Sequence, residues 1–221
     1  MIEPILVVGG GLALLGGVVV LSWLHEEKRS EAFLRYAAQR GWTFERNGLG
    51  RMDEVSSFKL FSRGRERRLT NVVFGPQDGV TVSVGDYRYT VDRGRSARTH
   101  HQTLCVVRVP GLDLPHFFVR RQVMLVDDLG KLLGGQDLNF EEDPDFSKAW
   151  VLQTEGDEHH VRRVFHPRAR MAFTAGLAGK SPEVEAHGDA LLLYFGRRLG
   201  VDELGGLIAD AVNLARCWQR G

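Results

Sequence analysis

The sequence predicts an α+β protein in which an N-terminal transmembrane helix precedes a mainly antiparallel sheet domain with helices packed at its ends. Three observations lead to this prediction. An uncharged run at residues 5–24 precedes the first cluster of charges. Short segments rich in β-branched and aromatic residues follow it, separated by turn residues. An amphipathic segment at residues 204–218 ends the chain.

The apolar run at residues 5–24 is predicted to span a membrane. Twenty residues make about 30 Å of helix, which matches the hydrocarbon core of a bilayer. Trp23 lies where an interfacial aromatic residue is expected. A cleaved signal peptide is disfavoured, because the segment lacks a basic start and a small-residue cleavage site. A Rossmann turn from Gly9 is disfavoured, because Leu14 stands where the fingerprint needs a small residue.

The charges beside the apolar run predict its orientation. No Lys or Arg precedes it, whereas Lys28, Arg29, Arg35 and Arg40 follow it. The positive-inside rule therefore predicts a single-pass protein with its N-terminus outside and its domain in the cytoplasm.

A stripe of small residues on one face of the predicted membrane helix favours close approach of two such helices. The stripe consists of Gly9, Ala13 and Gly17. A homodimer formed through the membrane helix is one hypothesis for this stripe, and the alternative is that it reflects the general frequency of Gly in membrane helices.

After the membrane segment, residues 26–40 are predicted as a helix that follows a short break near Trp23. Strands are predicted at residues 42–45, 58–62, 69–75, 80–91, 100–109 and 116–121. The turn residues at 76–79 make the third and fourth of these a hairpin. The parity of the apolar side chains changes at Gly85, which predicts a β-bulge that keeps both halves of that strand on the core side.

The second half of the chain mixes helices and strands. Asp143 is predicted as an N-cap with Pro144 at the first helical position. The remaining predictions are helices at 127–133, 157–165, 168–177 and 204–218, a strand at 150–154, and a hairpin of 184–187 with 190–195. A weak domain boundary is predicted near residues 134–137. It divides the chain into an anchor at 1–25, a strand-rich lobe at 26–134 and an α+β lobe at 135–221. The alternative is one continuous domain at 26–221.

Composition and motifs exclude several function classes. The chain has 29 Lys and Arg against 28 Asp and Glu, a net charge of +1 that disfavours a dedicated nucleic-acid-binding protein. The sequence Gly179-Lys180-Ser181 resembles the end of a P-loop, but Thr174 replaces the first glycine of that motif. No nucleophile motif is present, and the two cysteines cannot form a zinc site alone. We therefore expect no cofactor and no metal.

Basic residues are concentrated in two segments despite the neutral total. These residues are Arg63, Arg65, Arg67, Arg68, Arg93, Arg95 and Arg98. Near an anionic membrane leaflet each cation adds about 1 kcal/mol of attraction. We interpret the segments first as solvated loops. The functional alternative is contact with anionic lipid or with an acidic protein partner, and RNA binding is disfavoured because no stacking motif accompanies the arginines.

Several short runs carry acids, aromatic residues and prolines at turn positions. They are residues 40–42, 85–90, 102–103, 135–140, 145–147, 157–158, 161–162 and 165–167. With these runs the chain resembles an uncharacterised family of bacterial membrane-tethered proteins, from about residue 35 onward. The resemblance implies a domain anchored in the bacterial inner (cell) membrane and supplies no catalytic residue.

Together these observations predict a membrane-anchored protein with a cytoplasmic binding or scaffolding domain. The alternative is a membrane-tethered enzyme or ligand sensor with a polar cleft, for which the candidate residues are Asp145, His159, Arg162 and His166. Strongly shifted pKa values in such a cleft would favour the alternative. A structural component of the envelope is a third class, which a domain facing outside would support.

Overall fold

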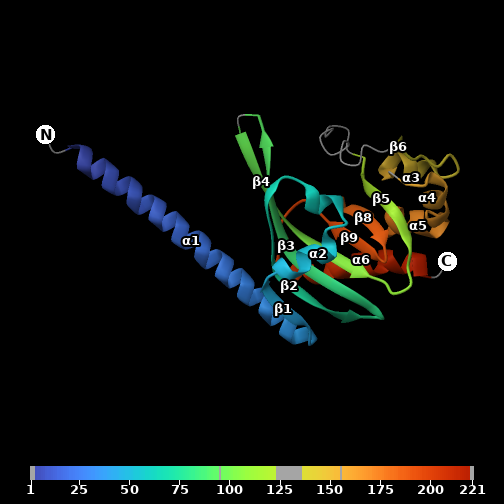
Figure 1. Ribbon diagram of the computed structural model, residues 1–221, viewed down its shortest axis with the longest axis horizontal. Helices are drawn as coiled ribbons and strands as arrows, with labels where there is room; N and C mark the ends of the chain where they lie inside the picture. Colours follow the sequence, from blue (N-terminus) through green and yellow to red (C-terminus); the bar gives the residue numbers. More distant parts are fainter. Residues whose placement is uncertain (1–2, 95, 123–135, 155, 220–221) are drawn as a thin grey trace.

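The computed structural model describes residues 3–94, 96–122, 136–154 and 156–219. For residues 3–19 it describes the course of the helix alone, and the side chains of Arg93 and Gln136 are likewise outside it. Within the described residues the chain forms one nine-stranded sheet, and a long N-terminal helix projects from it (Figure 1). Each strand pair is antiparallel, so the predicted α+β class is confirmed.

The N-terminal helix α1 runs from Glu3 to Arg40 without interruption, so the predicted break near Trp23 is wrong. Its last turns pack Phe33 and Ala37 into the core, while its first turns extend beyond the sheet (Figure 1). Among the described residues, no helix is long and apolar enough to cross a membrane. Most of the predicted span at 5–24 lies outside the residues whose side chains the structure describes.

The sheet has the strand order β1-β2-β3-β4-β9-β8-β5-β7-β6. Its strands are β1 (Thr43–Asn47), β2 (Arg65–Gln77), β3 (Val80–Arg93), β4 (Ser96–Arg108), β5 (Leu114–Arg121), β6 (Gln136–Asp137), β7 (Trp150–Thr154), β8 (Glu183–Gly188) and β9 (Ala190–Tyr194). The predicted hairpin at 76–79 is confirmed, because Asp78 and Gly79 both take positive φ in the two-residue turn between β2 and β3.

Short helices connect and cover the strands. They are η1 (Leu49–Arg51), α2 (Met52–Val55), η2 (Lys59–Ser62), α3 (Pro144–Ala149), α4 (Glu158–Val164), α5 (Pro167–Met171), η3 (Ala172–Gly176), η4 (Val201–Glu203) and α6 (Leu204–Gln219). The strand predicted at 58–62 is wrong, since η2 occupies it. The predicted N-cap is confirmed, because the Asp143 side chain accepts a hydrogen bond from the backbone N–H of Phe146. The helix predicted at 127–133 lies outside the described residues.

The sheet buries both of its faces. One face carries α1 and α6 and includes Val84 of β3, and the other lies beneath α2 and η2 and includes Tyr87 and Tyr89. A register shift is present opposite Gly85, but its extra residue lies in β2, so the prediction that a bulge in β3 keeps both halves of that strand on one core side is wrong. β3 pairs with β4 without a register shift, and its two sets of apolar residues face two different cores.

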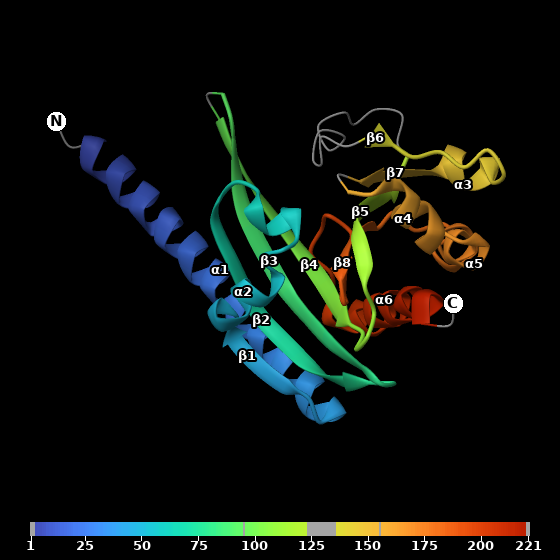
Figure 2. The same cartoon turned by 45° about the vertical axis from the view of Figure 1, so that its right-hand side comes forward.

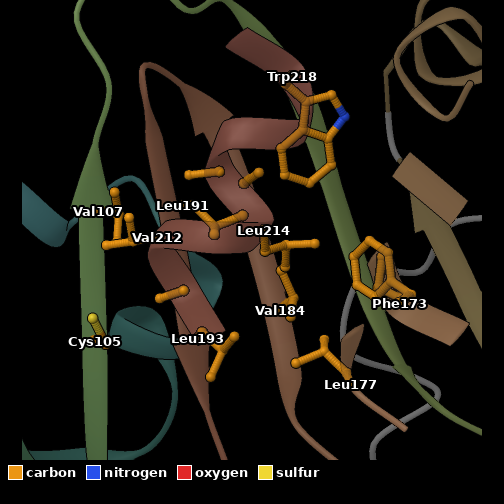
Figure 3. Packing of buried hydrophobic residues seen from close by; sticks show 14 of the residues in the cluster. Cys105, Val107, Phe173, Leu177, Val184, Leu191, Leu193, Val212, Leu214 and Trp218 are labelled. Carbon is orange, nitrogen blue, oxygen red and sulfur yellow. The ribbon is translucent and has the colours of Figure 1, made fainter. Parts of the chain in front are cut away.

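The second half of the chain completes the same sheet. β8 and β9 lie between β4 and β5, so both predicted lobes contribute strands to one sheet. The amphipathic helix α6, predicted at 204–218, packs across β4 and β9 (Figure 3). Figure 3 shows Val212 of α6 beside Val107 of β4, with Trp218 near the end of the helix.

Candidate functional site

The carboxylate of Asp86 on β3 is buried against α1 and held by two arginines. Its side chain is 5% exposed, and that of its partner Arg29 on α1 is 11% exposed. The Arg29 guanidinium donates to it from Nε at 2.6 Å and from Nη2 at 2.7 Å. Arg198, which lies between β9 and η4, donates to the same carboxylate at 3.4 Å and to Glu26 of α1 at 2.6 Å. Paired charges therefore join α1 to two separate segments of the domain.

Uncharged groups complete this arrangement, which we call the junction cluster. Its members are Glu26, Arg29, Ser30, Asn71, Asp86, Thr103 and Arg198. Asn71 donates to Asp86 at 3.2 Å and accepts from the Ser30 hydroxyl at 2.7 Å. Thr103 donates to Asp86 at 2.9 Å. Several donors thus satisfy the buried carboxylate, which offsets the cost of removing its charge from water.

A bulge in β2 places Asn71 in the junction cluster. The register of β2 against β3 shifts between Thr70 and Val73, and Asn71 has a φ of 52° within that shift. Asn adopts this left-handed conformation more readily than most residues. The local irregularity of β2 therefore serves the contact with α1.

The pKa values of the acids reflect these contacts. Burial alone would raise the pKa of Asp86, but the hydrogen bonds and charge of Arg29, together with Arg198 and Asn71, outweigh it and lower the pKa. The hydrogen bond from Arg198 likewise lowers the pKa of Glu26. Burial opposes the charged form of Arg198, yet Glu26 and Asp86 raise its pKa overall. The cluster is therefore charged at neutral pH and held together by ion pairs.

A cavity of about 500 Å³, which we call the junction cavity, opens beside the cluster between α1 and the sheet. Its lining includes Trp23 and Glu26 of α1, Arg68 of β2, Arg88 of β3, His101 of β4, and Arg198. Arg68 is the partner of Arg88 across β2 and β3, and Arg88 is the partner of His101 across β3 and β4. Opposed residues of antiparallel strands project from the same face, so these three form one basic row.

The basic row has unused hydrogen-bonding capacity. Among the described residues, neither Arg68 nor Arg88 forms an ion pair, and the Nε of Arg88 is buried without a hydrogen-bond partner. Burial lowers the pKa of His101, and the charges of Arg198 and Arg88 lower it further. The side chains of this row therefore make a positive environment beside α1.

The basic residues predicted from sequence take different roles. Arg65 pairs with Asp92 and Glu66, and Arg67 donates to the backbone carbonyl of Phe61. Arg63 lies over the ring of Tyr89, Arg98 is exposed, and Arg68 lines the junction cavity. The side chain of Arg93 and the whole of Arg95 lie outside the described residues.

The four residues of the predicted polar cleft differ in exposure and in the contacts they make. Asp145 is exposed in the first turn of α3, and His159 is exposed on α4. Arg162 pairs with Glu158 at 2.8 Å and lies over the ring of Phe140. His166 caps α5 by accepting from the backbone N–H of Ala169. Arg162 also donates to the backbone carbonyl of Asn139 at 2.9 Å, so it connects α4 to the segment before α3, whereas the cap by His166 is local to α5.

A second buried carboxylate lies on the opposite side of the sheet. Glu185 of β8 is fully buried and accepts from the backbone N–H of Lys59 at 2.7 Å. The ring of His116 lies 2.7 Å from the same carboxylate. Glu185 thus fixes the start of η2 to the sheet, and the sequence gives no local sign of this long-range contact.

Two further expectations concern the membrane helix and metals. The stripe of Gly9, Ala13 and Gly17 lies outside the residues whose side chains are described. Within the described part of the chain, no group of three or more His, Cys, Asp or Glu could hold a metal ion.

Comparison with known proteins gives a fold relationship. No family model and no curated protein matches the chain. A solved structure, the crystal structure of the mycobacterial trehalose monomycolate transport factor A, TtfA, is similar to it with a TM-score of 0.53 and 13% sequence identity. The match covers 86% of this chain and 91% of that chain. At this identity the likeness shows the fold alone.

Proposed function

We propose that this chain is a membrane-anchored binding module whose N-terminal helix holds the domain in a fixed orientation at the bilayer surface. The observation that carries the proposal is the continuity of α1 from Glu3 to Arg40. Its last turns are fixed to the domain by Phe33 in the core and by the ion pair of Arg29 with Asp86. A helix held in this way transmits the position of its first half to the domain.

Exposed apolar side chains support insertion of the first half of α1. Val20, Leu21, Trp23 and Leu24 are between 42% and 67% exposed, directly before the charged residues of the helix. Such a concentration of apolar surface is typical of a membrane or partner contact. The hairpin of β3 and β4 extends toward the same side of the molecule as the first half of α1 (Figures 1 and 2). The basic row lies on β2 and on this hairpin, at the cavity beside α1.

The proposed location is the bacterial inner membrane, with the N-terminus outside and the domain in the cytoplasm. Lys28, Arg29, Arg35 and Arg40 follow the apolar run, and no cation precedes it. The proposed partners are the bilayer, through residues 5–24, and an anionic lipid or acidic protein at the basic residues. The fold shared with a trehalose monomycolate transport factor adds a direction for the partner search, namely transport proteins of the same membrane.

Membrane fractionation combined with protease protection tests this proposal. The chain with a C-terminal tag should stay with the membrane pellet after alkaline carbonate extraction. In intact spheroplasts the tag should survive added protease, and it should be digested after lysis. Release by carbonate would refute the anchor. Digestion in intact spheroplasts would refute the orientation and favour an envelope role.

A second copy of the chain is the proposed partner within the bilayer. Gly9, Ala13 and Gly17 would form the contact, since small residues let helices approach closely. Replacing Gly9 and Gly17 by Leu should abolish cross-linked dimers in membranes. Replacing Gly11 and Val18 by Leu provides a matched control, because at 100° per residue both lie on the opposite side of the helix. Dimers that persist in the first variant would refute this contact.

A further inference from the structure

The junction cavity has more positive than negative charge. Three arginines line it, Arg68, Arg88 and Arg198, against the two acids Glu26 and Asp86. Both acids are already engaged by Arg198, and Asp86 is also engaged by Arg29. The guanidinium groups of Arg68 and Arg88 are therefore not neutralised by the described residues.

We propose that the junction cavity is a binding site for a phosphate group, carried on a membrane lipid headgroup or on a free phosphate compound. The lipid source rests on the function proposed above, whereas the phosphate chemistry does not. Guanidinium groups bind phosphate oxygens through paired hydrogen bonds, and two of the residues that carry them, Arg68 and Arg88, are paired across β2 and β3 and line the same cavity.

The unpartnered Nε of Arg88 points to a ligand that accepts hydrogen bonds. This atom is buried and has no partner among the described residues. A buried donor without an acceptor costs free energy, and the rest of the Arg88 side chain lines the cavity without an ion pair among the described residues, so its charge is available to an anion there. The cavity volume of about 500 Å³ exceeds what a single ion needs and suits a headgroup.

The place of the cavity in the fold favours a lipid as the source. Trp23, which lines it, is 63% exposed and borders the apolar end of the predicted span. Tryptophan is enriched at the level of lipid headgroups. A headgroup at that level would lie beside the basic row, with its acyl chains along α1.

The first experiment titrates the full chain in neutral detergent with inorganic phosphate at constant ionic strength. The readout is the NMR signal of the His101 ring, assigned with His101→Gln. Phosphate should produce a saturable shift and raise the pKa of His101, because an anion stabilises the imidazolium. Arg88→Gln and Arg68→Gln should each weaken binding about tenfold or more, since each removes a charge-assisted contact.

Matched controls remove the same charge from the far side of the molecule. The control variants are Arg163→Gln and Arg168→Gln. Arg163 lies on α4 and Arg168 lies on α5, and both helices are far from α1 (Figure 2). Both variants should leave the phosphate dissociation constant unchanged. Arg68 is exposed, so its replacement tests the site even if Arg88→Gln fails to fold. A phosphate response that is absent, or that survives in Arg68→Gln, overturns the proposal.

The second experiment identifies the source of the phosphate. The chain is placed in nanodiscs of phosphatidylcholine alone or with phosphatidylglycerol, and the pKa of His101 is measured in both. A higher pKa of His101 in the discs that contain phosphatidylglycerol supports a lipid headgroup as the source of the phosphate, provided that the Arg68→Gln variant does not show this increase. A response to inorganic phosphate but not to phosphatidylglycerol supports the phosphate site and overturns the lipid source. If the chain fails to enter nanodiscs, the proposed membrane anchor is refuted. The phosphate site is not refuted by that result, because the titration in detergent does not depend on the anchor.

Discussion

At the scale of single residues, the charge of Asp86 should control how firmly the domain is held together. Asp86→Asn removes the negative charge and leaves Arg29 buried beside a neutral amide. Breaking a buried ion pair in this way costs about 3–5 kcal/mol. Urea unfolding of the full chain in detergent should show that loss. Asp92→Asn, which breaks the exposed pair with Arg65, should change the stability little, and equal effects of the two variants would contradict this role.

The dependence of stability on pH should carry the signature of the same carboxyl. Its pKa lies below the ordinary value of 3.8, so its contribution to stability is complete above that pH. The contribution is lost as the pH falls from the ordinary value through the lower pKa of the folded state. The stability difference between the wild type and Asp86→Asn should therefore be constant from pH 7 to 5 and shrink below pH 4. A constant difference down to pH 3 would exclude this linkage.

The sequence could suggest only part of this site. Arg68 belongs to a basic segment that composition alone reveals, and Trp23 and Glu26 adjoin the predicted span. Asp86 shows no local signal, because its partner Arg29 is 57 residues away in the chain. Arg198 reaches the cavity only through the sheet order that joins β4 to β9, whereas His101 reaches it through the pairing of β3 with β4. Contacts of this separation depend on tertiary structure, which local patterns do not encode.

At the scale of elements, the packing of α1 should depend on one face of the helix. Phe33 is fully buried in the core, whereas its neighbour Leu34 is 51% exposed. Phe33→Ala should cost about 3–5 kcal/mol, the usual loss for removing a buried aromatic ring. Leu34→Ala on the same turn should change the stability far less. Urea unfolding of both variants checks this, and similar losses would show that α1 is not docked as described.

The elements also show where sequence patterns succeed and fail. The hairpin turn at residues 76–79 and the cap at Asp143 were predictable because their chemistry is local. Residues 59–62 form η2, with Phe58 as its N-cap, because burial of Phe58 and Leu60 beneath the sheet outweighs strand propensity. The change of parity at Gly85 reflects two buried faces, and an alternating pattern cannot distinguish this from a bulge.

At the scale of the whole molecule, a continuous α1 should fix the rotation of the domain about the helix axis. Two alanines inserted after Leu24 would turn the domain by about 200° and lift it by about 3 Å. Four alanines would turn it by about 40° beyond a full circle and lift it by about 6 Å. If the rotation of the domain decides which surface meets the bilayer, the four-residue insertion should preserve the native contact with the bilayer better than the two-residue insertion.

A fluorophore on Ala97→Cys in a Cys217→Ser background measures this orientation. Ala97 is exposed near the end of the β3–β4 hairpin, and Cys105 is buried. Quenching by spin-labelled lipid headgroups should fall more with two inserted residues than with four. The reverse order would mean that height alone matters and that α1 is not rigid at the membrane.

The position of β8 and β9 between β4 and β5 has a consequence for synthesis at the ribosome. When α1 and the first five strands have emerged, β4 and β5 have not yet received the strands that join them. Both therefore keep edges with unpaired backbone groups, and such edges readily pair with other chains. Completion of the sheet waits for residues 183–194, almost at the end of the chain. A nascent chain of this protein would thus need protection for most of its translation, already beside the membrane if α1 inserts early.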